Sequence, residues 1–66
     1  MTKFKQFMQD NDIDIKDFAY EMKLTQATLY GWMAGRRIPH IKSLAKLRSY
    51  FQEHNIDLDV IDMFIN

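Results

Sequence analysis

The chain has 66 residues, of which 47% are hydrophobic and 14% aromatic, and it contains no cysteine. This length makes one domain, the apolar content argues against disorder, and the lack of cysteine excludes disulfide bonds and thiolate metal sites. Nine basic and nine acidic residues cancel to a formal net charge of zero. No apolar run reaches the roughly 18 residues of a membrane span, and none follows residues 1–5 as in a secretory signal. We therefore expect a cytoplasmic protein that does not bind membranes.

Apolar residues recur at helical spacing in five segments, and no alternating apolar and polar pattern typical of a strand persists. The first segment covers about residues 4–8 and ends near residues 10–12. The second runs through residues 15–22, and Asp14 is suited to be its N-cap because a short carboxylate can accept a first-turn N–H.

The third segment begins after Thr25, which is also a good N-cap, and ends at Gly35. The fourth follows Pro39, and the fifth spans about residues 57–65. From these five segments we predict an all-α protein, a compact five-helix bundle in a single domain of residues 1–66.

The second and third segments are joined by little more than residues 23–24. A connection this short forces two helices to cross steeply, at roughly 90–120°. Such a crossing needs a small residue at the closest approach, for which Ala19 is suited. It also needs apolar residues on the inner face of the third helix, for which Leu29 and Trp32 are suited. The pattern predicts a helix-turn-helix over about residues 15–34.

The segment Asp14–Pro39 resembles the helix-turn-helix of phage repressor and Cro-like proteins, the lambda repressor-like DNA-binding domains, and the resemblance covers roughly residues 4–52. Trp-x-x-Gly-Arg-Arg-x-Pro is its most specific part. The sequence departs from the family at Lys23, Ile15 and Ala34, where Gly, Gln and Asn are usual, and these departures concern the details of DNA contact. The anchors at the family's spacing are Ala19, Leu24, Leu29, Trp32, Gly35 and Pro39.

The resemblance implies sequence-specific binding of double-stranded DNA by a transcriptional repressor of the phage or mobile-element type, in a bacterial or phage-infected cell. In this geometry the third helix enters the major groove with its N-terminal residues at the base edges. Gln26 can make a bidentate amide contact to adenine. Gly31, unusual inside a helix, has two interpretations: close approach to the groove, or a tolerated defect. The expected base-contacting residues are Gln26, Ala27, Thr28, Tyr30 and Gly31.

Positive charge is concentrated in the middle of the chain. Residues 22–52 contain six Lys or Arg and no Asp or Glu, whereas residues 1–21 sum to −2 (three basic, five acidic) and residues 53–66 to −4 (none basic, four acidic). This distribution is typical of a surface that lies against a polyanion, and the alternative is a solvated face whose arginines pair with the acidic ends. From charge and motif together, the expected phosphate-contacting residues are Lys16, Arg36, Arg37, His40 and Lys42.

Apolar residues fill most of the circumference of the helix expected at residues 57–65, more than a terminal helix that touches one core requires. We therefore predict a two-fold homodimer that reads an inverted-repeat operator with half-sites about 34 Å apart. The alternative is that this helix closes its own small core, or the core of a longer chain. The expected interface residues are Leu58, Ile61, Phe64 and Ile65.

Two other binding functions stay open. The same fold could serve as a protein-interaction module, or as an antitoxin-like regulator that binds both its promoter and a toxin, and the pI near 6.7 is low for a DNA-binding protein. We expect no enzyme activity, cofactor, metal or small-molecule substrate. The chain has no nucleophile–base constellation, His40 and His54 lack metal-ligand spacing, and the aspartates at positions 10–17 lack the Gly and terminal Glu of a calcium loop.

Overall fold

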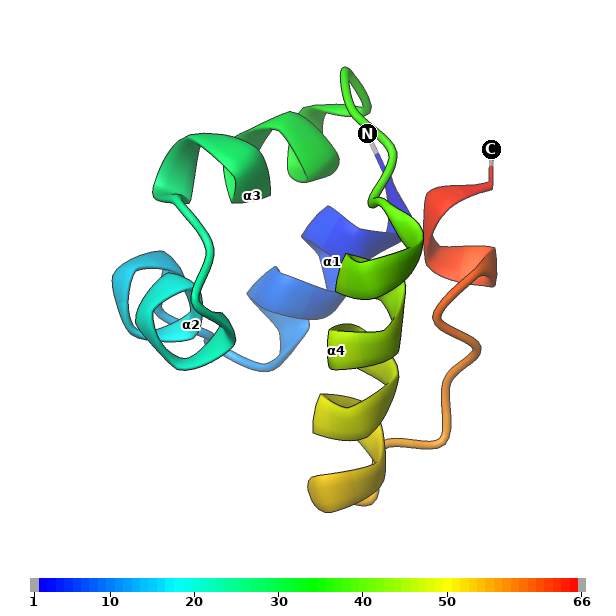
Figure 1. The fold of residues 1–66 in the computed structure, drawn as a ribbon. Helices are drawn as coiled ribbons and strands as arrows, with labels where there is room; N and C mark the ends of the chain where they lie inside the picture. Colours follow the sequence, from blue (N-terminus) through cyan, green and yellow to red (C-terminus); the bar gives the residue numbers. More distant parts are fainter. Residues whose placement is uncertain (1, 66) are drawn as a thin grey trace.

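The computed structural model describes residues 2–65, and in that range the chain is all-helical and has no strand. Its Cα extents are 27 × 25 × 24 Å. Figure 1 shows α3 across the top, α2 on the left and α4 on the right, with the C-terminal segment beyond α4. No helix in the described range is long and apolar enough to cross a membrane. The elements are α1 (Lys3–Asp10), α2 (Ile15–Met22), α3 (Gln26–Ala34), α4 (Ile41–Glu53) and the short 3-10 helix η1 (Asp62–Phe64).

Side chains cap the first three helices. Thr2, Asp14 and Thr25 each accept a hydrogen bond from the backbone N–H three residues further on, at 3.3, 3.1 and 3.1 Å respectively. These bonds satisfy N–H groups that have no partner within the helix. The N-caps predicted at Asp14 and Thr25 are therefore confirmed. The fourth helix differs, because His40 at its N-cap position makes no such hydrogen bond.

Left-handed residues end α2 and α3. Gly35 has a φ of 80°, as expected for the glycine that ends α3. Lys23 has φ 57° and ψ 45° at the end of α2, a conformation that costs a residue with a Cβ on the order of 1 kcal/mol. The N–H of Leu24 then bonds the carbonyl of Ala19 at 2.9 Å, which turns the chain directly toward α3.

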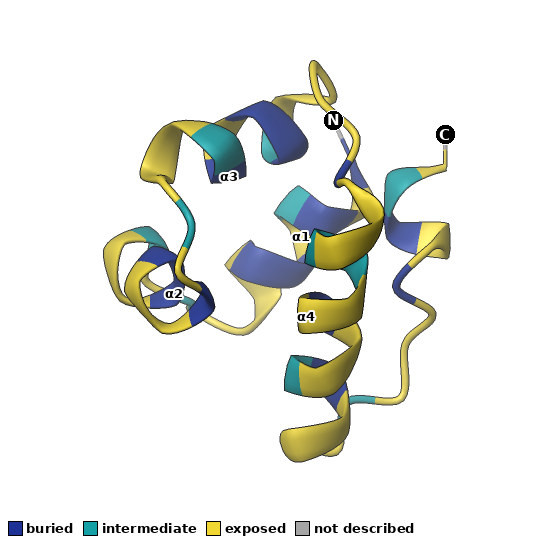
Figure 2. Cartoon of the chain, viewed as in Figure 1, coloured by how far each residue is buried: buried dark blue, intermediate teal, exposed yellow. Residues whose placement is uncertain are grey.

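The core is apolar and receives side chains from every element (Figure 2). Trp32 of α3 lies edge-on to Phe4 of α1 with ring centroids 5.8 Å apart, and to Phe64 of η1 at 5.9 Å. Ala19 and Leu29 are buried where α2 and α3 meet, as the spacing predicted. The buried apolar residues are Phe4, Phe7, Met8, Phe18, Ala19, Met22, Leu29, Trp32, Leu47, Phe51, Val60 and Met63.

The prediction of a fifth α-helix over residues 57–65 is wrong. Asn55 adopts a φ of 56° after α4, residues 56–59 have no regular structure, and only η1 is helical beyond them. The carboxylate of Asp59 accepts a hydrogen bond from the N–H of Ile61 at 2.9 Å. A local bond of this kind competes with helix formation, and the segment runs alongside α4 without regular structure before the turn that leads into η1. The five-helix bundle is therefore a four-helix fold closed by a short turn.

The apolar side chains of this segment do not share one face. Val60 and Met63 are buried in the core, and the ring of Phe64 lies 5.3 Å from that of Phe4. Phe64, predicted to form a dimer interface, therefore packs within its own chain. This part of the segment closes the core, as the alternative interpretation expected. Leu58, Ile61 and Ile65, the other predicted interface residues, are exposed.

Candidate nucleic-acid interface

The first turns of α3 form an exposed surface. Gln26 and Ala27 are exposed, and Tyr30 one turn later is 50% exposed. Thr28 is half-buried, and its hydroxyl lies 2.8 Å from that of Thr25. Four predicted base-contacting residues thus belong to the same end of α3, and three of them present their side chains to solvent.

Gly31 is placed differently from these four residues, because it is buried. Its carbonyl accepts hydrogen bonds from the N–H groups of Arg36 at 3.0 Å and Arg37 at 3.2 Å. A Cβ at Gly31 would lie 3.0 Å from Cδ and 3.1 Å from Cγ of Arg37. The structure adds a third interpretation to the two that the sequence offered. The glycine leaves room for the aliphatic part of the Arg37 side chain.

The loop between α3 and α4 carries exposed cations. Arg36 and Arg37 are exposed in the loop, His40 precedes α4 and Lys42 lies in its first turn, while Pro39 between them is buried. Within residues 2–65 the one ion pair joins Lys3 and Asp62. In this range the two arginines therefore do not pair with the acidic ends of the chain. Four predicted phosphate-contacting residues are therefore exposed in this loop and in the helix turn that follows it.

The N-terminus of α4 adds backbone N–H groups to this surface. No side chain caps it, so the N–H groups of its first turn are not satisfied in the way those of α1, α2 and α3 are. A helix N-terminus also carries a partial positive charge. With Arg37, His40 and Lys42 nearby in the sequence, these groups form a surface suited to an anion such as phosphate.

Lys16, the fifth predicted phosphate contact, lies apart in the first turn of α2, where it is exposed. The N-terminus of that helix differs from that of α4, because the carboxylate of Asp14 already accepts the N–H of Asp17. The negative charges of Asp14 and Asp17 beside this turn repel an anion. The structure therefore favours α4 over α2 as a phosphate-binding helix end.

Two contacts that position α2 and α3 are not visible in the sequence. The Nζ of Lys46 in α4 donates a hydrogen bond to the carbonyl of Met22, the last residue of α2, at 3.2 Å. The buried hydroxyl of Thr2 donates to the carbonyls of Trp32 at 3.0 Å and Met33 at 3.1 Å, near the end of α3. Thr2 could be recognised as an N-cap from its residue type, but nothing in either pattern indicates a partner 24 or 30 residues away.

Among the residues that the structure describes, no three His, Cys, Asp or Glu side chains are grouped closely enough to hold a metal ion. Comparison with known proteins found no matching family model, no similar curated protein and no similar solved structure.

Proposed function

We propose that this protein binds double-stranded DNA in a sequence-specific manner and regulates transcription, most simply as a repressor of the phage or mobile-element type. In this proposal α2 and α3 form a helix-turn-helix, and α3 is the helix that reads the major groove. One observation carries the proposal: the exposed first turns of α3 are followed by an exposed cationic loop and an uncapped helix N-terminus.

Base recognition would come from the exposed side chains of α3. Gln26 has an amide that can donate to N7 and accept from N6 of adenine, and Ala27 offers a methyl group to thymine. Tyr30 can bond a phosphate or pack on a sugar. Because the hydroxyl of Thr28 already bonds that of Thr25 in the free protein, Thr28 is better suited to contact through its methyl group.

Phosphate binding would come from Arg36, Arg37, His40 and Lys42, together with the first-turn N–H groups of α4. Contacts of this kind fix the position of a protein on the duplex but carry no sequence information. They also bring α3 against the groove. A chain that occupies an operator in this way represses transcription by occlusion, without a cofactor or catalysis.

The test is selection of bound duplexes from a random-sequence DNA pool at about 100 mM salt, followed by sequencing. An enriched motif is the expected result, and the Gln26→Ala variant should lose preference at one or more positions of that motif while still retaining DNA. Retention without any enriched motif would contradict sequence-specific binding. No retention at all would overturn DNA binding and favour a protein-interaction module or an antitoxin-like regulator.

A further inference from the structure

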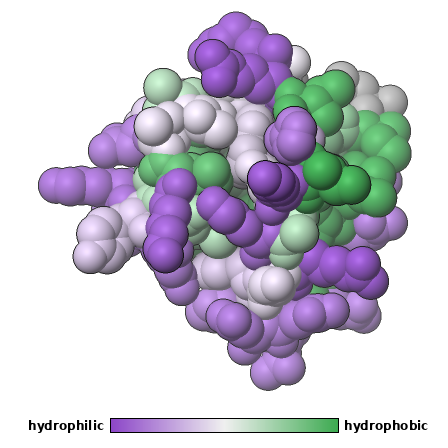
Figure 3. All heavy atoms as spheres, in the orientation of Figure 1, coloured by the Kyte–Doolittle hydropathy of each residue, from purple (hydrophilic) through white to green (hydrophobic). Residues whose placement is uncertain are grey.

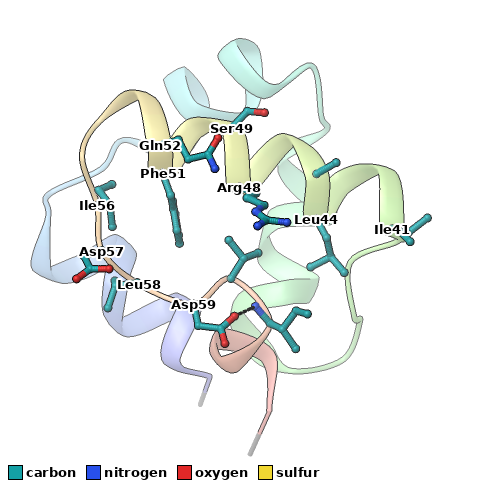
Figure 4. Close-up of a pocket in the computed structure, with 13 residues that line it drawn as sticks. Ile41, Leu44, Arg48, Ser49, Phe51, Gln52, Ile56, Asp57, Leu58 and Asp59 are labelled. Carbon is teal, nitrogen blue, oxygen red and sulfur yellow. Dashed lines mark hydrogen bonds between the residues drawn. The ribbon is translucent and has the colours of Figure 1, made fainter.

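A groove runs between α4 and the segment that follows it, residues 56–61, with a volume of about 920 Å³. Figure 4 shows side chains of α4 on one wall and side chains of the later segment on the other. Phe51 and Val60, which line the groove, belong to the buried core, whereas most of the other lining residues are exposed. The volume lies at the upper end of the roughly 300–1,000 Å³ of pockets that hold small ligands, so the groove has room for several side chains.

Three apolar side chains of the groove are exposed. Ile41 is 74% exposed, Ile61 60% and Leu58 52%. Figure 3 shows hydrophobic surface gathered on the side of the molecule where the C-terminal segment and the start of α4 lie. Scattered exposed leucines and isoleucines are ordinary, but several grouped around one hollow are typical of a surface that contacts another molecule.

The charges in the groove do not balance. Arg48 projects from α4, and Asp57 and Asp59 come from the opposite wall. The carboxylate of Asp59 accepts the N–H of Ile61 at 2.9 Å, a bond that leaves its negative charge in place. None of the three charged side chains has an ion-pair partner among residues 2–65. One cation against two carboxylates gives the groove a net charge of −1, which favours an occupant with positive charge.

The segment that forms the second wall also has free main-chain groups. Residues 56–59 belong to no helix or turn. Among residues 2–65, the N–H groups of residues 57–60 and the carbonyls of residues 56–59 have no hydrogen-bonding partner. A polypeptide that lies along the groove can bond these groups with its own N–H and carbonyl groups, which an aliphatic ligand cannot do.

We infer that the groove binds a segment of another protein that carries large apolar side chains and at least one Lys or Arg. The apolar side chains of this segment pack against Leu58 and Ile61, its cation pairs with Asp57, and its main chain bonds the free groups of residues 57–59. A second copy of this chain, docked groove to groove, fits less well. It would bring another net charge of −1 against the first.

The groove and the proposed DNA-binding surface are separate. None of the predicted base-contacting or phosphate-contacting residues lines the groove. In Figure 1, α3 extends away from the groove side of α4. Binding of a partner segment therefore does not depend on DNA binding, and a loss of one can be distinguished from a loss of the other.

The first test is selection from a random peptide library displayed on phage, with the full chain immobilised and no DNA present. The expected result is a set of enriched peptides that combine large apolar residues with Lys or Arg and carry a net positive charge. Absence of enrichment, or enrichment of neutral or acidic peptides, would overturn the inference.

Nuclear magnetic resonance then locates the bound peptide. One enriched peptide, made synthetically, is titrated into isotope-labelled protein. The amide signals of residues 56–61 should shift, while those of Gln26 and Ala27 on α3 should not. Shifts confined to residues outside the groove would overturn the inference. Signals of residues 56–61 that depend on protein concentration without peptide would do so too, because a second copy would then occupy the groove.

The third test measures the affinity of the same peptide for variants. Ala45→Arg places a long side chain in the groove from an exposed position of α4, and Asp57→Lys reverses a charge, so each should weaken binding by at least about tenfold. Asp10→Lys is the matched control, because it makes the same charge change on exposed α1 outside the groove and should leave binding unchanged. Circular dichroism checks that each variant is folded.

Two results would place the peptide elsewhere. Either both groove variants bind it as tightly as the wild type, or Asp10→Lys weakens binding as much as Asp57→Lys does. The charge is tested from the other side by a peptide whose Lys and Arg are replaced by Glu, which should bind the wild type at least about tenfold more weakly. Equal affinity of the two peptides would contradict recognition by charge.

Discussion

Lys46 of α4 donates a hydrogen bond from its Nζ to the main-chain carbonyl of Met22, the last residue of α2, at 3.2 Å. A carbonyl at a helix C-terminus has no partner within its own helix, and a cation there also interacts favourably with the helix dipole. This bond joins the end of α2 to α4, the second helix after it in the chain.

We expect Lys46→Met, which keeps most of the aliphatic chain and removes the donor, to lower the free energy of unfolding by about 1 kcal/mol. Lys42→Met is the matched control, because Lys42 is an exposed lysine of the same helix without this bond. Urea unfolding followed by circular dichroism measures both variants. Equal stability of the two would show that the bond contributes nothing.

Because Arg37 lies close to Gly31, substitutions at these two positions should have non-additive effects on the free energy of unfolding. Alanine is favoured over glycine in a helix by about 0.5–1 kcal/mol, but a Cβ at Gly31 crowds the aliphatic part of Arg37 at 3.0 Å. Gly31→Ala alone should therefore change stability little. The same substitution in an Arg37→Ala background should stabilise the protein by about 0.5–1 kcal/mol, because Cγ and Cδ are gone. A double-mutant cycle measures the coupling, and additive effects would contradict the crowding.

Phe64 packs within its own chain, so its removal should destabilise the monomer. Its ring lies 5.3 Å from that of Phe4 and 5.9 Å from that of Trp32. Because Phe64 is only half-buried, we expect Phe64→Ala to cost about 2–3 kcal/mol, less than a fully buried phenylalanine. Tyr20→Ala is the control, since this aromatic side chain on α2 is 87% exposed and should change stability by less than about 0.5 kcal/mol. The measurement is urea unfolding at low protein concentration.

The pKa of Tyr50 predicts that the folded protein loses stability at alkaline pH. Burial, and then the nearby negative charge of Glu21, raise the pKa of the Tyr50 phenol above its ordinary value of 10.0. As the pH rises, the Tyr50 phenol therefore loses its proton in the unfolded chain before it does so in the folded protein. The contribution of Tyr50 to the free energy of unfolding is fully present below pH 10.0 and is lost as the pH passes the raised pKa. Between about pH 8 and pH 11 the free energy of unfolding should fall more for the wild type than for Tyr50→Phe. Equal losses would contradict the raised pKa.

If α3 contacts bases and the loop after it contacts phosphates, variants in these two regions should affect DNA binding differently. Gln26→Ala should weaken binding to the selected operator by about 1–3 kcal/mol and leave binding to unrelated DNA unchanged. Arg36→Ala should weaken both and reduce the slope of log K against log salt by about 1. Titrations at several salt concentrations separate the two effects, with Lys5→Ala on α1 as the control. Identical profiles for the first two variants would contradict the division.

Local structure was predictable where it depends on neighbouring residues. The caps at Asp14 and Thr25 and the stop at Gly35 follow from a side chain or a φ value that acts within one turn. Lys23 ends α2 in a left-handed conformation at a position where the family that the chain resembles usually has Gly. Burial of Ala19 and Trp32 followed from helical spacing alone.

Features that depend on distant partners were not predictable. The apolar residues after Asp57 suggested a helix, but the Asp59–Ile61 hydrogen bond and packing onto the core selected turns instead. The role of Gly31 likewise depends on Arg37, which reaches it only after the chain turns past Gly35. In the candidate site, the residues themselves were named from the sequence, whereas the uncapped N-terminus of α4 emerged from the three-dimensional arrangement.

Trp32 is the only tryptophan of the chain, and its ring lies edge-on to Phe4 and Phe64 at once. The protein therefore carries a natural optical probe at the point where α1, α3 and the C-terminal turn meet. Its emission should shift to longer wavelength if η1 detaches while α3 stays folded, because one side of the indole would then meet water. Stopped-flow fluorescence could follow the closing of the last turn in real time without any added label.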